Sequence, residues 1–340
     1  MGLKERITPA LALFFLAPAI GELLSGSSPP LEFFNPFSLF LLCLMYGGGA
    51  LLVREAVFRW KQGWLSMLLL GAAYGIAEEG LACKSFFDPN WMDIGVLGSY
   101  GRFADVNWIW TLELTAFHAV FSISASIILV TLLFPQKKDE PWLSRRSLYL
   151  AGAGFAFIIP FCYWLLTPYR PPAVPFALAI VVAALLVLLA WKLPRPFPWE
   201  KLLGAVDPHK PASVGWFTGF GLAWTPMLFF FSWIAVALIP SATVTGLLML
   251  AFFAASGILL ARKTYYGRNW TVMHQHGLVA GSLGFFVFLG FILELGGIRG
   301  MSAVAIGFVL FLLLLRRRLI ASEGRIPRRA QERPGVHFSM

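Results

Sequence analysis

Charged residues are scarce in this sequence. Only 13% of its 340 residues are Asp, Glu, Lys or Arg, whereas 58% are hydrophobic. A soluble globular domain has about 25% charged residues. The composition therefore excludes a large soluble enzyme and indicates an integral membrane protein.

Cysteine is rare too, and the common metal, nucleotide and cofactor motifs are missing. The three cysteines, Cys43, Cys83 and Cys162, lie within or at the edge of apolar runs and show no ligand spacing. The HEXXH zinc pattern, the Walker phosphate loop and the dinucleotide glycine motif are all absent. The sequence therefore predicts neither a disulfide framework nor a metal or cofactor site.

Long apolar runs are abundant, and each membrane span needs about 20 mostly apolar residues. The spans that we count are 7–25, 33–53, 64–83, 108–134, 148–168, 175–192, 215–239, 241–262, 273–295 and 302–316. The first run has a basic start like a signal peptide, but no small-residue cleavage site follows it, which favours an uncleaved helix. We expect an all-α, polytopic membrane protein of about ten transmembrane helices, with residues 1–316 as one membrane domain.

The positions of the basic residues test this count through the positive-inside rule. Ten spans place 23 Lys and Arg residues on one side of the membrane and four on the other. This asymmetry predicts a multi-pass protein of the cell membrane with both termini in the cytoplasm. It also explains the net charge of +10 without any nucleic-acid partner. The basic segment 317–340 is expected to be a flexible tail attracted to anionic headgroups.

Two adjacent carboxylates, Glu78 and Glu79, lie inside the apolar run 64–83. An ionised carboxylate at mid-membrane costs about 2.5–3.5 kcal/mol, so such residues usually face a protein interior or a wet cavity. The predicted topology places the pair in the outer half of the bilayer. Gly71 and Gly75 share the helical face of Glu79, so this face is expected to pack closely against a neighbouring helix.

The next predicted span offers partners for these acids. Thr111, Thr115, His118 and Ser122 recur at helical spacing and predict a polar face near mid-membrane. Glu113, on the same span, is a further candidate for a proton relay. Two alternatives remain open for the glutamate pair: a functional site with His118, or simple pairing with Lys84 or Arg102.

Other acids also gather on the predicted outer side. Glu22, Glu113 and Glu294 lie close to the outer ends of their spans. The long outer loop between the third and fourth spans is rich in aromatic residues and glycine. Such a loop is typical either of a lid or binding element or of an interfacial aromatic belt. Together these features predict a polar outer vestibule.

The run from 64 to 134 resembles the CAAX-protease and bacteriocin-processing (CPBP) family of intramembrane proteases. Glu78-Glu79 corresponds to the family's first motif, EExxxR, and His118 to the histidine of its second motif, FxxxH. Cys83 occupies the arginine position, Leu114 occupies the phenylalanine position, and neither His274 nor His276 begins the third motif. The resemblance implies that Glu78 or Glu79 is a general base that activates water and that His118 stabilises the oxyanion.

Three functions are compatible with these residues. The first is a membrane-embedded hydrolase, with Glu79 as the base and His118 and the hydroxyl groups orienting the reactants. The second is a secondary transporter or channel that couples protons or cations through the same acids. The third is a structural membrane subunit. The expected partners are the lipid bilayer and a membrane-embedded or small-molecule substrate, with no nucleic acid.

Overall fold

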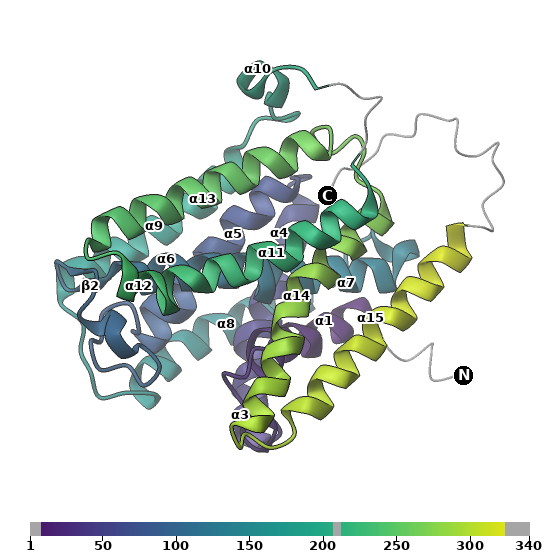
Figure 1. The fold of residues 1–340 in the computed structure, drawn as a ribbon. Helices are drawn as coiled ribbons and strands as arrows, with labels where there is room; N and C mark the ends of the chain where they lie inside the picture. The colour runs from purple at the N-terminus through teal and green to yellow at the C-terminus, as the bar shows by residue number, and fades with distance from the viewer. Residues whose placement is uncertain (1–7, 207–211, 324–340) are drawn as a thin grey trace.

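The fold is built almost entirely of helices, as a computed structural model of the chain shows (Figure 1). The structure describes residues 8–206 and 212–323. The first half contains α1 (Pro9–Pro18), η2 (Ala19–Leu24), α2 (Pro30–Phe33), α3 (Pro36–Leu42), η3 (Cys43–Gly47), α4 (Gly48–Arg59), α5 (Trp64–Gly75), η4 (Ile76–Cys83), η5 (Gly95–Gly98), β1 (Arg102–Phe103), β2 (Val106–Asn107), α6 (Trp108–Phe117), η6 (His118–Ala125), α7 (Ser126–Leu133) and η7 (Pro135–Lys137). The second half contains α8 (Arg145–Leu165), α9 (Ala173–Lys192), α10 (Trp199–Leu203), α11 (Val214–Trp233), α12 (Ala235–Leu238), α13 (Ala242–Lys263), α14 (Val272–Leu295) and α15 (Met301–Glu323).

Each run of apolar residues that the sequence predicts as a span is helical here. In the described part of the chain, eight helices are long and apolar enough to cross a membrane. The helix over Pro9–Leu24 is shorter than these, and α15 is not one of the eight. The prediction of a mostly helical chain with many apolar spans is therefore confirmed, whereas length and composition alone do not establish the count of ten.

Three predicted boundaries are wrong, and the first is the end of the span 33–53, because that helix continues to Arg59. Helix α15 continues to Glu323, so the flexible tail does not begin at residue 317; residues 324–340 lie outside the described part of the chain. The run 215–239 is not one helix, because α11 ends at Trp233 and the short α12 follows it. Arginines 316–318 are helical although they are charged, since arginine itself has a high helix propensity.

The helix formed by α6, η6 and α7 is the central one. Of its most apolar window, 72% is buried, against 6% for α9. It contributes to two hydrophobic cores at once, since Phe121 and Leu129 pack with α11, α14 and α15, while Ile123 and Val130 pack with α1, η3, α4 and α5. Five polar residues of this helix are accordingly buried, namely Glu113, His118, Ser122, Ser124 and Ser126.

The predicted outer loop, 84–107, is ordered by hydrogen bonds. Strands β1 and β2 form an antiparallel hairpin that pairs Arg102 with Asn107. The buried Asn107 side chain donates to the carbonyls of Ser85 and Asp88, at 3.1 Å each. These bonds fix the start of α6 next to the end of η4, and so they bring the elements that carry Glu79 and His118 together.

Candidate functional site

The two segments that carry the candidate residues are both π-helical. Glu78 and Glu79 lie in η4, and His118 is the first residue of η6. Short π-helical segments inside α-helices occur frequently at functional sites. The wider turn of a π-helix reduces the angle between adjacent residues, which lets both glutamates face the same neighbouring helix.

Glycine brings the two helices close enough for contact. A Cβ atom on Gly71 would lie 2.8 Å from Cα of Ala119, and one on Gly75 would lie 3.0 Å from Cβ of His118. A larger side chain at Gly71 would therefore clash with backbone. The predicted close-packing face is confirmed, and it sets the distance between the glutamates and the histidine.

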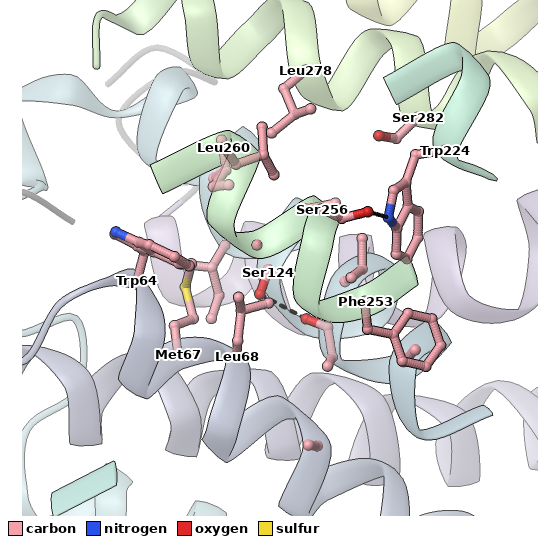
Figure 2. Close-up of a pocket in the computed structure, with 18 of the residues that line it drawn as sticks. Trp64, Met67, Leu68, Ser124, Trp224, Phe253, Ser256, Leu260, Leu278 and Ser282 are labelled. Atoms are coloured by element: carbon pink, nitrogen blue, oxygen red, sulfur yellow. Dashed lines mark hydrogen bonds between the residues drawn. The ribbon is translucent and has the colours of Figure 1, made fainter. Parts of the chain in front are cut away.

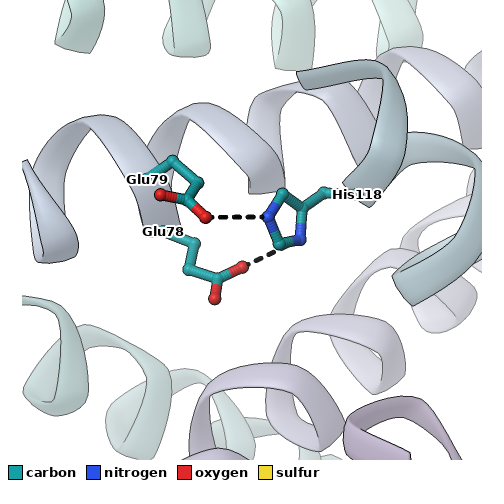
Figure 3. A group of neighbouring side chains, drawn as sticks. All are labelled: Glu78, Glu79 and His118. Atoms are coloured by element: carbon teal, nitrogen blue, oxygen red, sulfur yellow. Dashed lines mark hydrogen bonds and ion pairs between the residues drawn. The ribbon is translucent and has the colours of Figure 1, made fainter. Parts of the chain in front are cut away.

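Glu78, Glu79 and His118 meet in space (Figure 3). Nδ1 of His118 lies 3.0 Å from Oε2 of Glu78, and Nε2 lies 3.2 Å from Oε1 of Glu79. Nδ1 is also 3.1 Å from the hydroxyl oxygen of Ser122. Glu78 and His118 are buried, at 4% and 1% exposed. The site is thus enclosed by protein, and the imidazole lies between the two carboxylates.

The two carboxylates are held differently. Glu79 is bonded at both oxygens, because Oε1 contacts His118 and Oε2 accepts a hydrogen bond from Ser85, whose own hydroxyl accepts from Trp110. Oε2 of Glu78 is buried and has no hydrogen-bond partner, although it lies close to the ring of His118. An unsatisfied buried carboxylate oxygen is costly. Glu78 is therefore the less completely bonded of the two carboxylates.

Two tyrosines and a third acid surround the imidazole. The rings of Tyr46 and Tyr74 each lie with their centroids 5.8 Å from that of His118. Tyr46 donates its hydroxyl to Glu22, and Ser28 donates to the other oxygen of Glu22 at 2.6 Å. The buried hydroxyl of Tyr74 has no partner. A hydroxyl donor and a carboxylate acceptor are therefore both free in this part of the core.

Neither predicted cationic partner joins the site. Lys84 donates to the carbonyls of Tyr163, Thr167 and Tyr169 at 2.5, 2.8 and 3.1 Å, and burial lowers the pKa of its ammonium group. Arg102 donates to the carbonyl of Phe87 and to Asn107, at 2.8 Å each. Pairing of Lys84 or Arg102 with the glutamates is therefore not what stabilises them.

The other predicted residues are distributed around the site. Ser122 is in contact with His118, but Thr111 and Thr115 line a separate apolar cavity of about 590 Å³ that neither glutamate lines. Glu113 is buried with one oxygen unpartnered and makes no hydrogen bond to the three central residues. Glu294 binds the backbone and hydroxyl of Ser302 at the start of α15 instead. Glu113 and Glu294 therefore do not line one vestibule together with the glutamates that surround His118.

Sequence reasoning did not assign Glu22, Tyr46, Ser85 or Trp110 to the site. Glu22 was visible as an acid in an apolar run, and Tyr46 directly precedes the Gly47-Gly48-Gly49 segment. Nothing in their spacing relates them to His118, because they come from separate helices. The two other histidines of the described spans bond elsewhere, His274 near Thr271 and His276 to the carbonyl of Leu312.

The three central residues also have the donor set of a metal site. One ligand atom each from Glu78, Glu79 and His118 lies within 4.8 Å of the others. Carboxylate oxygen and imidazole nitrogen are common ligands of zinc and other divalent transition metals. The arrangement can therefore act on a water molecule through a carboxylate, or it can bind a cation.

Comparison with known proteins gives one match. A family model described as an uncharacterized membrane protein family matches residues 11–323. No curated protein and no solved structure matches the chain. The match covers every helix from α3 to α14, including both segments of the site.

Proposed function

The chain belongs to this uncharacterized membrane protein family, and we propose that it is a membrane-embedded hydrolase that activates water with Glu78. One observation supports this most directly: a buried carboxylate, a partly buried carboxylate and a buried imidazole converge, and one oxygen of the buried carboxylate has no hydrogen bond among the described residues. Water in a protein interior needs two to four polar partners. Glu78 and the Tyr74 hydroxyl supply two such partners.

The proposed chemistry divides the roles between the carboxylates. Glu78 takes a proton from water as the water oxygen bonds to the substrate carbonyl carbon. The Tyr74 hydroxyl, which has no hydrogen-bond partner in the described part of the chain, donates to the oxyanion that develops, and the adjacent imidazole of His118 stabilises it electrostatically. Glu78 then returns the proton to the leaving group as its bond to carbon breaks. Glu79 holds the ring of His118 in place through Nε2. This assignment differs from the hydrolase hypothesis drawn from the sequence, in which Glu79 is the base; here Glu78 is the base and Glu79 orients His118.

The proposal includes the membrane topology. Ten spans with both termini in the cytoplasm place 23 basic residues inside and four outside. Pro9–Leu24 and α15 then cross the membrane besides the eight apolar helices described above. In this orientation Glu78 and Glu79 lie in the outer half of the bilayer, close to the end of η4. The substrate is then a membrane-embedded or small molecule that reaches this depth.

The test uses water labelled with heavy oxygen, because hydrolysis transfers the label to a product. The full chain is reconstituted into vesicles with a membrane extract from the host, and mass spectrometry detects labelled carboxyl or hydroxyl products. We expect labelled product from the wild type, and a rate at least about 100-fold lower in Glu78→Gln. Glu32→Gln is the matched control, since Glu32 is an exposed carboxylate.

Two results would contradict the proposal. The first is the absence of any labelled product in wild-type vesicles, and the second is a Glu78→Gln rate equal to that of the wild type. Addition of EDTA is expected to leave the rate unchanged. A rate that EDTA abolishes and zinc restores would instead assign the three residues to a catalytic metal.

A second candidate function is cation or proton coupling in transport, favoured by the cation-binding geometry of the same residues. It predicts a pH-gradient-driven flux across the vesicle membrane that is lost in both Glu78→Gln and His118→Ala, with no labelled product. Loss of thermal stability in these variants, with neither flux nor product in the wild type, would indicate a structural subunit.

A further inference from the structure

A large apolar cavity lies between the two halves of the helical assembly (Figure 2). Its volume is about 590 Å³, and it is lined by residues of α5, α6, η6, α7, α9, α11, α13 and α14. This volume is within the range of about 300–1,000 Å³ for small-molecule sites. None of the described residues that line it is charged. The cavity therefore fits a hydrocarbon chain rather than an ion or a polar solute.

Seven hydroxyl groups lie on its wall; four of them are hydrogen-bonded within the protein, whereas that of Thr111 is buried without a partner in the described part of the chain. Ser124 donates to the carbonyl of Ala119 at 2.6 Å, and Thr131 donates to that of Ile127 at 2.8 Å. Ser256 accepts from the indole of Trp224 at 3.0 Å. A polar headgroup in this cavity would find few free partners, so its cost of desolvation would not be repaid.

A second cavity, of about 690 Å³, adjoins the first at one end. Trp64 lines both cavities, and its ring stacks on that of Trp199 with centroids 5.3 Å apart. The second cavity is basic, because the exposed Lys61, Arg195 and Lys201 line it. Among its described lining residues the one acid is Glu200, which is paired with Arg268 at 2.8 Å. An apolar compartment and a cationic compartment therefore share one wall.

We propose that the two cavities form a single binding site for a phospholipid with an anionic headgroup. The phosphate lies in the basic cavity near Lys61, Arg195 and Lys201, and one acyl chain lies in the apolar cavity. Both compartments are needed for this assignment, since a soluble anion would leave the apolar cavity empty and an uncharged lipid would leave the cations unpaired. The proposal is independent of the hydrolase, because neither glutamate nor His118 lines these cavities.

The dimensions and the position agree with a lipid. The cavity follows α5 from Trp64 to Ile76, the first residue of η4, which is about 18 Å at helical rise. This direction is that of an acyl chain in a bilayer. The basic compartment lies at the end predicted to face the cytoplasm, where the leaflet carries anionic lipids that attract Lys and Arg.

The experiment is native mass spectrometry of the purified full chain with equal amounts of phosphatidylglycerol and phosphatidylcholine that carry the same acyl chains. We expect the wild type to retain phosphatidylglycerol preferentially. The triple variant Lys61→Gln, Arg195→Gln, Lys201→Gln should lose this preference by about fivefold for each charge removed. Arg146→Gln, at an exposed basic residue outside the cavity, is the matched control.

A second variant tests the acyl chain separately. Gly257 lines the apolar cavity, and a Cβ atom there would meet nothing within 4 Å, so the side chain of Gly257→Leu starts in open space at the cavity wall. We expect it to reduce retention of both lipids. Gly307→Leu is the control, since Gly307 on α15 has equally open space and does not line the cavity.

Three results would overturn the proposal. They are a wild type without lipid preference, a triple variant that keeps the preference, and a Gly257→Leu variant that retains lipid like the wild type. Equal losses in Arg146→Gln and the triple variant would assign the preference to the general basic surface.

Discussion

Besides Glu79, four acids lie in apolar runs near the predicted outer ends of their spans. The structure places these four in different environments. Glu78 and Glu22 lie around His118, whereas Glu113 is buried apart from them and Glu294 binds the start of α15. Sequence identifies such residues because a charge in hydrocarbon is costly. It does not identify their partners, since these come from other helices.

The first residue-scale prediction separates the two site glutamates. We expect Glu79→Gln to lower kcat by about tenfold, less than Glu78→Gln, because a glutamine amide can still bond Ser85 and His118. KM should stay close to that of the wild type, since Glu79 acts through the imidazole. Steady-state kinetics of both variants checks this. A Glu79→Gln loss larger than that of Glu78→Gln would reverse the assigned roles.

A second prediction concerns a buried ion pair far from the site in sequence. Glu55 binds Arg54 at 2.7 Å, Arg59 at 2.9 Å and the backbone of Trp142 at 2.7 Å, and Arg54 and Glu55 are at most 1% exposed. Glu55→Gln leaves a buried guanidinium without its charge partner, so we expect a loss of about 3–5 kcal/mol in the free energy of unfolding.

The control for Glu55 is Glu140, whose carboxylate pairs with Lys137 at the exposed surface. We expect Glu140→Gln to cost about 0–1 kcal/mol. Thermal unfolding of the purified variants in the same detergent gives both values. Equal stability of the two variants would show that the buried pair contributes no more than the exposed one.

A third prediction follows from Lys84. Burial lowers the pKa of its ammonium group below the ordinary value of 10.5. The unfolded chain therefore binds more protons than the folded chain between the lowered pKa and 10.5, and the stability contribution of Lys84 rises with pH across that window. We expect this rise to disappear in Lys84→Met when unfolding is followed against pH. A stability difference between wild type and variant that is constant across the window would contradict it.

At the scale of elements, the π-helical segments explain where the sequence prediction fails. The prediction of a shared face for Thr111, Thr115, His118 and Ser122 assumes an α-helical period throughout. The change to π geometry at His118 separates the first two residues from the last two, and it turns both glutamates of η4 toward His118. No residue pattern in the sequence signals this change, because it results from packing.

The fourth prediction tests the contact between α5 and η6. In Gly71→Ala, the new methyl group would lie 2.8 Å from Cα of Ala119, so the helices must separate. We expect a cost of about 1–3 kcal/mol, together with lower hydrolysis because Glu79 and His118 move apart. Gly219→Ala on α11 is the control, since a Cβ atom there has nothing within 4 Å. Unchanged stability and activity in Gly71→Ala would mean that the contact does not set the site.

At the scale of the whole molecule, the sequence predicts the helices well, because a helix in hydrocarbon must be long and apolar. Trp64–Cys83 agrees with its predicted bounds at both ends, and most other spans agree within three residues. The prediction is weaker where charge and helix formation compete, as in α15. The packing of the halves, and with it both cavities, depends on side-chain complementarity between helices that are distant in sequence.

The fifth prediction tests the topology with single cysteines in a variant that lacks the three native ones. Ser99→Cys lies in the loop after η4, and Ser144→Cys lies in the turn before α8; both positions are exposed. A membrane-impermeant maleimide should label the cysteine at position 99 in intact cells. It should label the cysteine at position 144 only after the cells are permeabilised. Labelling of both in intact cells would contradict the proposed orientation.

The most direct test of the central claim is the transfer of heavy oxygen from water to product in vesicles that contain the wild type, Glu78→Gln or Glu32→Gln. Labelled product from the wild type and Glu32→Gln, with at least about a 100-fold lower rate in Glu78→Gln, is the predicted result. Equal labelling with Glu78→Gln, or no labelled product from the wild type, would contradict the assignment of Glu78 as the residue that activates water.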